Sequence, residues 1–293
     1  MAKEMGHSRP VRTPAPTTAI IGVVFDLEDK VNGEMNIQIQ NGLQSEAARL
    51  GYTIRAHWTA DERDLAQFLD GCAGILAVNI KKPAALDRVM GCGKPVVRAG
   101  WTVPLEQVDL VGGTDREAGV AVANYLYGLG HRDIVFVHGD IDLRGRRERL
   151  HGLLEVVDAS ADMTCHDLTS GPGTSFAAGL DRILATGAQP TAFFCGHDGL
   201  AITACSNILS RGWQIPLDVS VVGFCDFSAA LQVSPALTTV KIRGQEFGRS
   251  AVRRLDTRLR HPGLALPPMR LLVPNILIER GSTGPALEKV PRR

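Results

Sequence analysis

The chain has 293 residues, 44% of them hydrophobic, and its 32 basic and 31 acidic side chains leave a net charge of +1. This length is sufficient for two domains with substantial cores. The balanced charge gives little electrostatic support for strong nucleic-acid binding by this chain alone. No apolar run approaches the roughly 20 residues that span a bilayer, and the N-terminus has no apolar core of the kind found in signal peptides. We therefore expect a cytoplasmic protein without a membrane partner.

Short apolar runs alternate with segments of helical period along the chain. Apolar, β-branched runs predict strands at 20–25, 52–56, 74–78, 95–98, 133–137, 191–195 and 219–223. Apolar residues repeating every three to four positions predict helices over 35–50, 118–129, 150–157, 201–208 and 247–259. Thr114 to Glu117 is interpreted as a capping box, and Asp198 as a helix N-cap. This alternation predicts a doubly wound, parallel α/β architecture.

The number of strand–helix units predicts two similar subdomains rather than one sheet. We expect the first to comprise 19–137 and about 241–269, and the second to comprise 138–240 and about 270–281. The short runs 270–273 and 275–278 are expected to return the chain to both subdomains. Residues 1–18 and 282–293 are predicted to be flexible ends.

Ligands of open parallel sheets bind beyond the carboxyl ends of the strands, and this rule selects candidate binding residues. Asp26 and Trp58 follow the first two strands, and His197 and Asp226 follow later ones. Each has a structural alternative: a solvated turn for Asp26, cover for a subdomain edge for Trp58, and a hydrogen bond to the helix start for His197. The same rule also selects His57, Asn79, His138 and Cys225.

Arg149 is a further candidate because it lies four residues before Leu153, so that its stem shares the inward face of a helix. Its planar guanidinium offers a donor fork for carboxylate, phosphate or sugar hydroxyls. The alternative is a surface ion pair with Glu148 or Glu155. The neighbouring arginines are expected to be solvated; they are Arg144, Arg146 and Arg147.

Sequence signatures of catalysis are absent. The chain has no G-x-x-x-x-G-K-[ST], G-x-S-x-G or H-E-x-x-H motif, and no G-x-G-x-x-G after a strand. Its six cysteines form no C-x-x-C pair, which is typical of reduced thiols rather than of a disulfide framework. We expect a binding protein rather than an enzyme, with no cofactor and no metal.

Several motifs follow one another between about Ala19 and Arg280. They are Ile21-Gly22-Val23-Val24, Leu129-Gly130-His131-Arg132-Asp133-Ile134, Arg149-x-x-Gly152, Ile215-Pro216 through Gly223-Phe224, and Pro235-Ala236-Leu237-Thr238-Thr239-Val240. In this order and spacing they resemble the effector domain of lactose- and galactose-repressor (LacI/GalR) family transcriptional regulators. The resemblance implies a periplasmic-binding-protein-like fold of two subdomains joined by three crossovers, with a small-molecule effector in the cleft. It also implies a homodimer in which effector-linked closure changes the spacing of two DNA-reading headpieces.

The sequence departs from the family pattern at the pocket. His197 occupies a position that is usually Asn, and Cys225 one where an Asp usually binds effector hydroxyls; Asp226 matches the next position. The usual aromatic platform falls near Thr174, which cannot stack. These departures leave open a sugar, an anionic metabolite contacting Arg149 and His197, or a pocket without a small ligand.

The sequence also departs from the pattern at the front. A complete member carries a helix-turn-helix of about 60 residues before the core, whereas residues 1–18 resemble at most a headpiece or hinge remnant. Operator DNA is therefore an expected partner only if a headpiece precedes this chain. The alternative function is a stand-alone cytoplasmic binding protein of the same fold that does not bind DNA.

Overall fold

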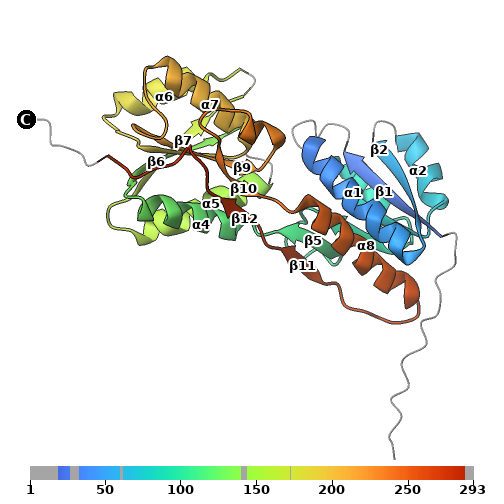
Figure 1. Cartoon of the computed structure of the whole chain (residues 1–293). Coiled ribbons are helices and arrows are strands. Elements are labelled where there is room, and N and C mark those ends of the chain that lie inside the picture. Colours follow the sequence, from blue (N-terminus) through green and yellow to red (C-terminus); the bar gives the residue numbers. More distant parts are fainter. Residues whose placement is uncertain (1–18, 27–32, 60–61, 140–143, 172, 288–293) are drawn as a thin grey trace, which may run out of the picture.

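The computed structural model describes residues 19–26, 33–59, 62–139, 144–171 and 173–287. Within these ranges the chain forms two six-stranded sheets, each covered by helices on both faces (Figure 1). The predicted α/β fold with two doubly wound subdomains is confirmed. None of the helices in these ranges has the length and apolarity required to cross a membrane.

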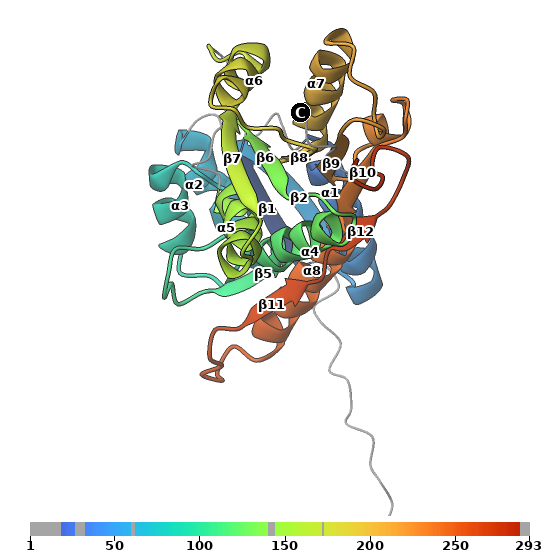
Figure 2. The ribbon, with the colours of Figure 1, turned by 90° about the vertical axis from the view of Figure 1, so that its left-hand side faces the viewer.

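The first sheet is parallel throughout, with strand order β11-β5-β4-β3-β1-β2. Its strands are β1 (Ile20–Asp26), β2 (Thr53–Thr59), β3 (Gly74–Val78), β4 (Val96–Ala99), β5 (Asp109–Gly113) and β11 (Arg270–Val273). One face packs on α1 (Gly33–Leu50) and α8 (Gly244–Arg260), the other on α2 (Glu62–Asp70) and α3 (Pro83–Met90) (Figure 2). Alternate residues of β1 serve the two faces, since Val23 belongs to the first core and Val24 to the second.

The second sheet has strand order β12-β10-β9-β8-β6-β7, and only the β10–β12 pair in it is antiparallel. Its strands are β6 (Asp133–His138), β7 (Thr164–Thr169), β8 (Ala192–Cys195), β9 (Ser220–Cys225), β10 (Thr238–Lys241) and β12 (Ile276–Ile278). One face packs on α4 (Asp115–Gly128) and α5 (Arg144–Ala159), the other on α6 (Phe176–Ala185) and α7 (Asp198–Ser210). A short 3-10 helix, η2 (Ser228–Leu231), follows β9.

The chain crosses between the sheets three times, as predicted: between β5 and α4, between β10 and α8, and between β11 and β12. The strand pairing moves two predicted boundaries. All of β6 lies in the second sheet, so the first subdomain ends near residue 113 rather than 137. Strand β11 pairs with β5, so residues 270–273 belong to the first subdomain, and only β12 returns to the second.

The predicted helix starts differ from the observed caps. Thr114 stands at the N-cap of α4, but its side chain makes no cap hydrogen bond. Its hydroxyl instead accepts from the backbone N–H of Asn275 at 3.1 Å, which ties the first crossover to the third. His197, not Asp198, caps α7. The capping-box and Asp198 predictions are wrong because tertiary partners take both side chains.

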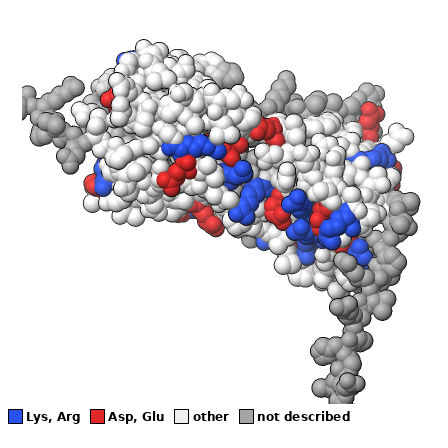
Figure 3. Space-filling view, in the orientation of Figure 1, with Lys and Arg blue, Asp and Glu red and all other residues white. Residues whose placement is uncertain are grey.

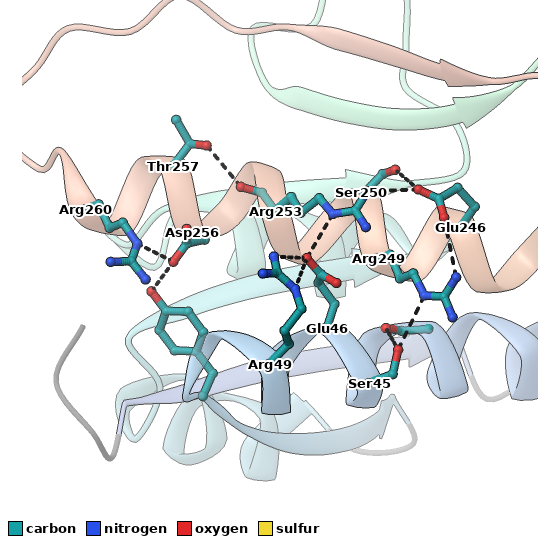
Figure 4. A network of polar contacts seen from close by, with 12 residues as sticks. Ser45, Glu46, Arg49, Glu246, Arg249, Ser250, Arg253, Asp256, Thr257 and Arg260 are labelled. Atoms are coloured by element: carbon teal, nitrogen blue, oxygen red, sulfur yellow. Dashed lines mark hydrogen bonds and ion pairs between the residues drawn. The ribbon is translucent and has the colours of Figure 1, made fainter. Parts of the chain in front are cut away.

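Helices α1 and α8 cross at glycines, and so do α4 and α5. A Cβ on Gly42 of α1 would lie 2.0 Å from the Gln245 carbonyl O, and one on Gly152 of α5 would lie 2.0 Å from the Arg116 carbonyl O. Over the first crossing, the Glu46 carboxylate accepts from Arg49 and Arg253 (Figure 4). These bonds, led by that from Arg49, lower the pKa of Glu46 to about 2.

The α1–α8 face carries interleaved charges of both signs along the surface (Figure 3). Interleaving of this kind neutralises the face locally instead of producing a single-sign field. The face is therefore not a strongly basic surface of the type that binds a nucleic-acid backbone.

The segment after residue 281 is attached to the second subdomain, so the predicted flexible tail begins too early. Ser282 is fully buried, and its hydroxyl donates to the Val221 carbonyl at 2.6 Å and accepts from the Thr238 N–H at 2.8 Å. Further along, the Ala286 N–H donates to the Leu129 carbonyl. The remaining predicted tail, 288–293, and the predicted flexible start, 1–18, lie outside the described residues.

Candidate functional site

A cavity of about 410 Å³ lies between the two subdomains, at the carboxyl ends of the strands. The first subdomain lines it with residues of α1 and of the segments after β3 and β4. The second lines it with the first turns of α5 and with His197, and Gly113, Asp115 and Ile242, at the first two crossovers, complete it. The described lining residues are Met35, Ile39, Asn79, Ile80, Lys81, Arg98, Gly100, Trp101, Gly113, Asp115, Arg144, Gly145, Arg146, Arg149, His197, Ile242 and Phe247.

Arg149 lies on this lining and is held from three sides. Its Nε donates to Asp115 Oδ1 at 2.6 Å, one terminal nitrogen donates to the Gly196 carbonyl, and the guanidinium lies 3.5 Å from the centre of the Phe224 ring. The inward orientation predicted from its helical position is therefore present. Its ion-pair partner is neither Glu148 nor Glu155 but Asp115. Burial raises the pKa of Asp115, and the opposing Arg149 charge does not cancel this effect.

His197 combines a cap and a lining position. Its Nδ1 accepts from the Leu200 N–H at 3.3 Å, so the proton of the neutral ring lies on Nε2. Burial, and then the charges of Arg146 and Arg149, lower the pKa of His197 to about 4. At neutral pH the ring is therefore an uncharged hydrogen-bond donor.

Three of the five predicted site residues do not line the cavity. Asp26 is 2% exposed and accepts a hydrogen bond from the Lys81 N–H at 2.9 Å. It therefore holds the backbone of the segment after β3 without lining the cavity itself. Trp58 lies on the edge strand β2 and stacks on Phe25 of β1 with a centroid distance of 4.6 Å, so it covers a subdomain edge, which was its structural alternative. The Asp226 carboxylate is paired with Arg280 at 2.6 Å and Lys241 at 3.1 Å.

Of the other residues selected at strand ends, Asn79 lines the cavity. His57 lies against Phe68, His138 pairs with Asp167 at 2.8 Å, and Cys225 is buried. The described residues contain no group of three or more His, Cys, Asp or Glu suited to a metal ion.

The sequence reasoning missed a large part of the lining. Arg146 was expected to be solvated, but it is 6% exposed and lines the cavity, as does Arg144. Trp101, two residues beyond β4, supplies an aromatic side chain from the first subdomain. Thr174, where the aromatic platform was expected, belongs to the second subdomain, is exposed and does not line the cavity. A strand-end rule that also counts the second residue after a strand would have selected Trp101, because β4 ends at Ala99.

Two contacts join the first and second subdomains beside the cavity. The Glu34 carboxylate at the start of α1 accepts from the N–H and the hydroxyl of Ser228, at 2.9 and 3.1 Å. The Arg144 guanidinium donates to the Thr102 carbonyl at 2.7 Å. We call these two contacts the cleft contacts. They hold the subdomains together around the cavity.

Two α/β subdomains with a cavity between them and three connecting segments define a binding protein that holds its ligand in an intersubdomain cleft. Residues 123–283 match the family described as periplasmic binding protein-like domain. The chain belongs to this family, and its core is of the LacI/GalR effector-binding type.

Relatives of this chain agree with this assignment. The chain is 28% identical to the HTH-type transcriptional repressor PurR of Vibrio cholerae over 235 residues, which cover 76% of this chain and 70% of the relative. The chain spans about half the length of other curated relatives that it matches. These relatives are HTH-type transcriptional repressors.

Solved structures share the fold. A transcriptional regulator CelR–cellobiose complex matches with a TM-score of 0.77 and 24% identity, over 92% of this chain and 86% of that one. A LacI family transcriptional regulator from Enterococcus faecium with bound ribose matches with a TM-score of 0.74 and 20% identity, over 91% and 99%.

Proposed function

We propose that this chain is the effector-sensing and dimerisation core of a LacI/GalR-like transcriptional regulator, which binds a small molecule in the intersubdomain cleft. The cavity between the walls is the observation that supports this most directly, because both subdomains and residues at the first two crossovers line it. The effector is a sugar, a sugar-derived compound or another anionic metabolite. Operator DNA is a partner where a DNA-reading headpiece is joined to this core.

The arrangement supports regulation by closure. A ligand that contacts both walls makes all of its contacts only when the subdomains are close together, so binding shifts the population toward the closed form. The shift equals the difference in affinity between the two forms. In a dimer, closure of the subdomains would move any DNA-reading headpiece that is joined to the chain before β1.

A pair of tryptophan variants tests the cleft as the ligand site. Thermal-shift measurements use the whole chain with a panel of ribose, cellobiose, glucuronate and glucose 6-phosphate. Trp101 lines the cavity and Trp58 does not, so Trp101→Ala is expected to reduce the shift caused by any stabilising compound at least two-fold. Trp58→Ala removes the same side chain outside the cavity and is expected to preserve the shift. Equal shifts in both variants would place the ligand elsewhere.

The second candidate is a stand-alone binding protein of the same fold. The net charge of +1 favours the stand-alone protein, because a chain with so little net charge offers little electrostatic attraction to DNA. The reading frame upstream of Met1 distinguishes the two. An in-frame helix-turn-helix supports the regulator, whereas a stop codon close upstream supports the stand-alone protein.

A further inference from the structure

The polar side chains on the cavity walls are predominantly hydrogen-bond donors. Lysine and arginine carry only N–H donors, and the indole of tryptophan has a single N–H. Both walls contribute such groups, since Lys81, Arg98 and Trp101 come from the first subdomain and three arginines from α5. The three arginines are Arg144, Arg146 and Arg149.

The described lining side chains include few acceptors, and those of Asp115 and His197 are already engaged. The Asp115 carboxylate accepts from Arg149 Nε. Asn79 Oδ1 lies against the backbone of Gly100, only 2.0 Å from where a Cβ would be on that glycine. His197 uses its acceptor nitrogen for the Leu200 N–H and has only a donor left. Some donors are engaged as well, since Arg98 pairs with Glu106, Arg144 donates to the Thr102 carbonyl and Arg149 pairs with Asp115. Among the described lining side chains, a ligand nevertheless meets more donors than acceptors.

This imbalance distinguishes between ligand classes. Each hydroxyl of a neutral sugar is both donor and acceptor, and a buried hydroxyl without an acceptor costs about 1–3 kcal/mol. Carboxylate and phosphate oxygens only accept, and their bonds to arginine are charge-assisted. A small oxyanion can therefore satisfy this lining, whereas a polyol leaves its own donors unsatisfied.

We infer that the cleft selects an oxyanion, a small molecule with at least one carboxylate or phosphate group held between donors of the two subdomains, over a neutral sugar. This inference rests on the proposed function and narrows its ligand. The cations belong to both walls, so the oxyanion screens their mutual repulsion as the cleft closes. Trp101 and Phe247 provide an apolar surface for the carbon skeleton of the ligand.

Calorimetric titration of the whole chain with matched probes tests the class. D-Glucose, D-gluconate, D-glucose 6-phosphate and 6-phospho-D-gluconate share six carbons and differ in their oxyanions, and citrate and pyrophosphate extend the test to other skeletons. At least one oxyanion probe is expected to bind at least ten-fold more tightly than glucose. Comparison of gluconate with glucose 6-phosphate shows whether the carboxylate or the phosphate is preferred.

Three variants connect the binding to the cavity. Arg146→Gln on α5 and Lys81→Gln on the opposite wall are each expected to weaken the oxyanion probe at least ten-fold. Lys81 is exposed at the cavity mouth, so its variant remains informative if the loss of the buried Arg146 impairs folding. Arg147→Gln removes the same charge from the same turn of α5 outside the cavity, and is expected to change the dissociation constant less than two-fold.

The contrary results differ in what they overturn. If glucose binds as tightly as every oxyanion probe and its binding is weakened by Arg146→Gln, the oxyanion class is wrong and the proposed effector site stands. If no oxyanion probe binds, the oxyanion class is wrong. If binding persists unchanged in both cavity variants, the cleft is not the effector site and both proposals fail.

Discussion

Arg149 and Asp115 are the residues whose roles depend most on burial. Their side chains are 10% and 6% exposed and form an ion pair at 2.6 Å between α5 and α4. A buried ion pair contributes little net stability when intact, because removal of both charges from water offsets their attraction. The loss of one partner is costly, because the other charge stays buried.

Arg149→Met is therefore expected to lower the free energy of unfolding by about 3–5 kcal/mol. The matched control is Arg116→Met, which breaks the exposed pair with Glu155 and should cost at most about 1 kcal/mol. Urea denaturation measures both variants. Combining Arg149→Met with Asp115→Leu should recover part of the loss, and a single-variant cost no larger than that of Arg116→Met would contradict this account.

His197 predicts a loss of stability in acid. Its folded pKa of about 4 lies below the ordinary value of 6.5, so between these values the unfolded chain takes up a proton that the folded chain does not. Stability is therefore lost as the pH falls from 6.5 to 4, by up to about 3 kcal/mol. Asp198, whose burial raises its pKa to about 6, opposes this because the folded state gains its proton first.

The His197→Asn variant isolates this contribution, because Asn is also a good N-cap and does not titrate. Chemical denaturation at pH 7.5 and 4.5 is expected to show that the variant loses about 2 kcal/mol less than the wild type over this interval. An equal acid loss in both proteins would mean that His197 already carries its proton in the folded state.

At the scale of single residues, sequence reasoning succeeded where a local signal existed. The helical position of Arg149 predicted its inward side chain, and the strand-end rule selected His197 and Asn79. The rule could not show that Asp226 is neutralised by Arg280, because that partner lies 54 residues away. It also could not distinguish Arg146 from Arg147, since only packing decides which neighbour is buried.

At the scale of elements, glycines set the distance between paired helices in both subdomains. Gly119 of α4 and Gly152 of α5 face each other, and a Cβ on either would come within about 2.2 Å of a carbonyl oxygen of the other helix. Gly42 and Gly248 do the same between α1 and α8. The first turns of α5 carry the cavity arginines, so their position depends on this close approach.

Gly152→Ala is expected to destabilise the protein by about 1–3 kcal/mol, because α4 and α5 must move apart. Gly128→Ala, at the exposed end of α4 where a Cβ meets nothing within 4 Å, is the control and should leave stability unchanged or raise it by up to about 1 kcal/mol. Thermal unfolding compares the two. A neutral Gly152→Ala would show that the helices can separate at little cost.

The elements themselves were predictable where their pattern was strong. Strands β1, β3 and β8 have buried, apolar residues and were predicted within one residue of their bounds. Strand β7 was not predicted, because Thr164–Thr169 is polar and lies at an exposed sheet edge. Helices α2 and α3 are short, and their apolar residues are too few to establish a period.

At the scale of the whole molecule, the cleft contacts favour the closed arrangement of the subdomains. Glu34→Ala removes the hydrogen bonds to Ser228, which together contribute about 1 kcal/mol at an exposed site, or about a five-fold change in the closed-to-open ratio. Small-angle scattering is expected to show a larger radius of gyration. The control is Glu155→Ala, which removes a carboxylate of α5 that does not line the cavity. An unchanged radius of gyration for Glu34→Ala would show that other contacts determine closure.

The three crossovers mean that neither subdomain is a continuous piece of the gene. The first sheet is complete only after β11 has been translated, and the second only after β12. Truncation before residue 270 would therefore leave both sheets without an edge strand, and no single fragment contains one whole subdomain and nothing else. A proteolytic cut in one crossover would leave the halves joined by the other two. Such a nicked protein would still close on its ligand as one molecule.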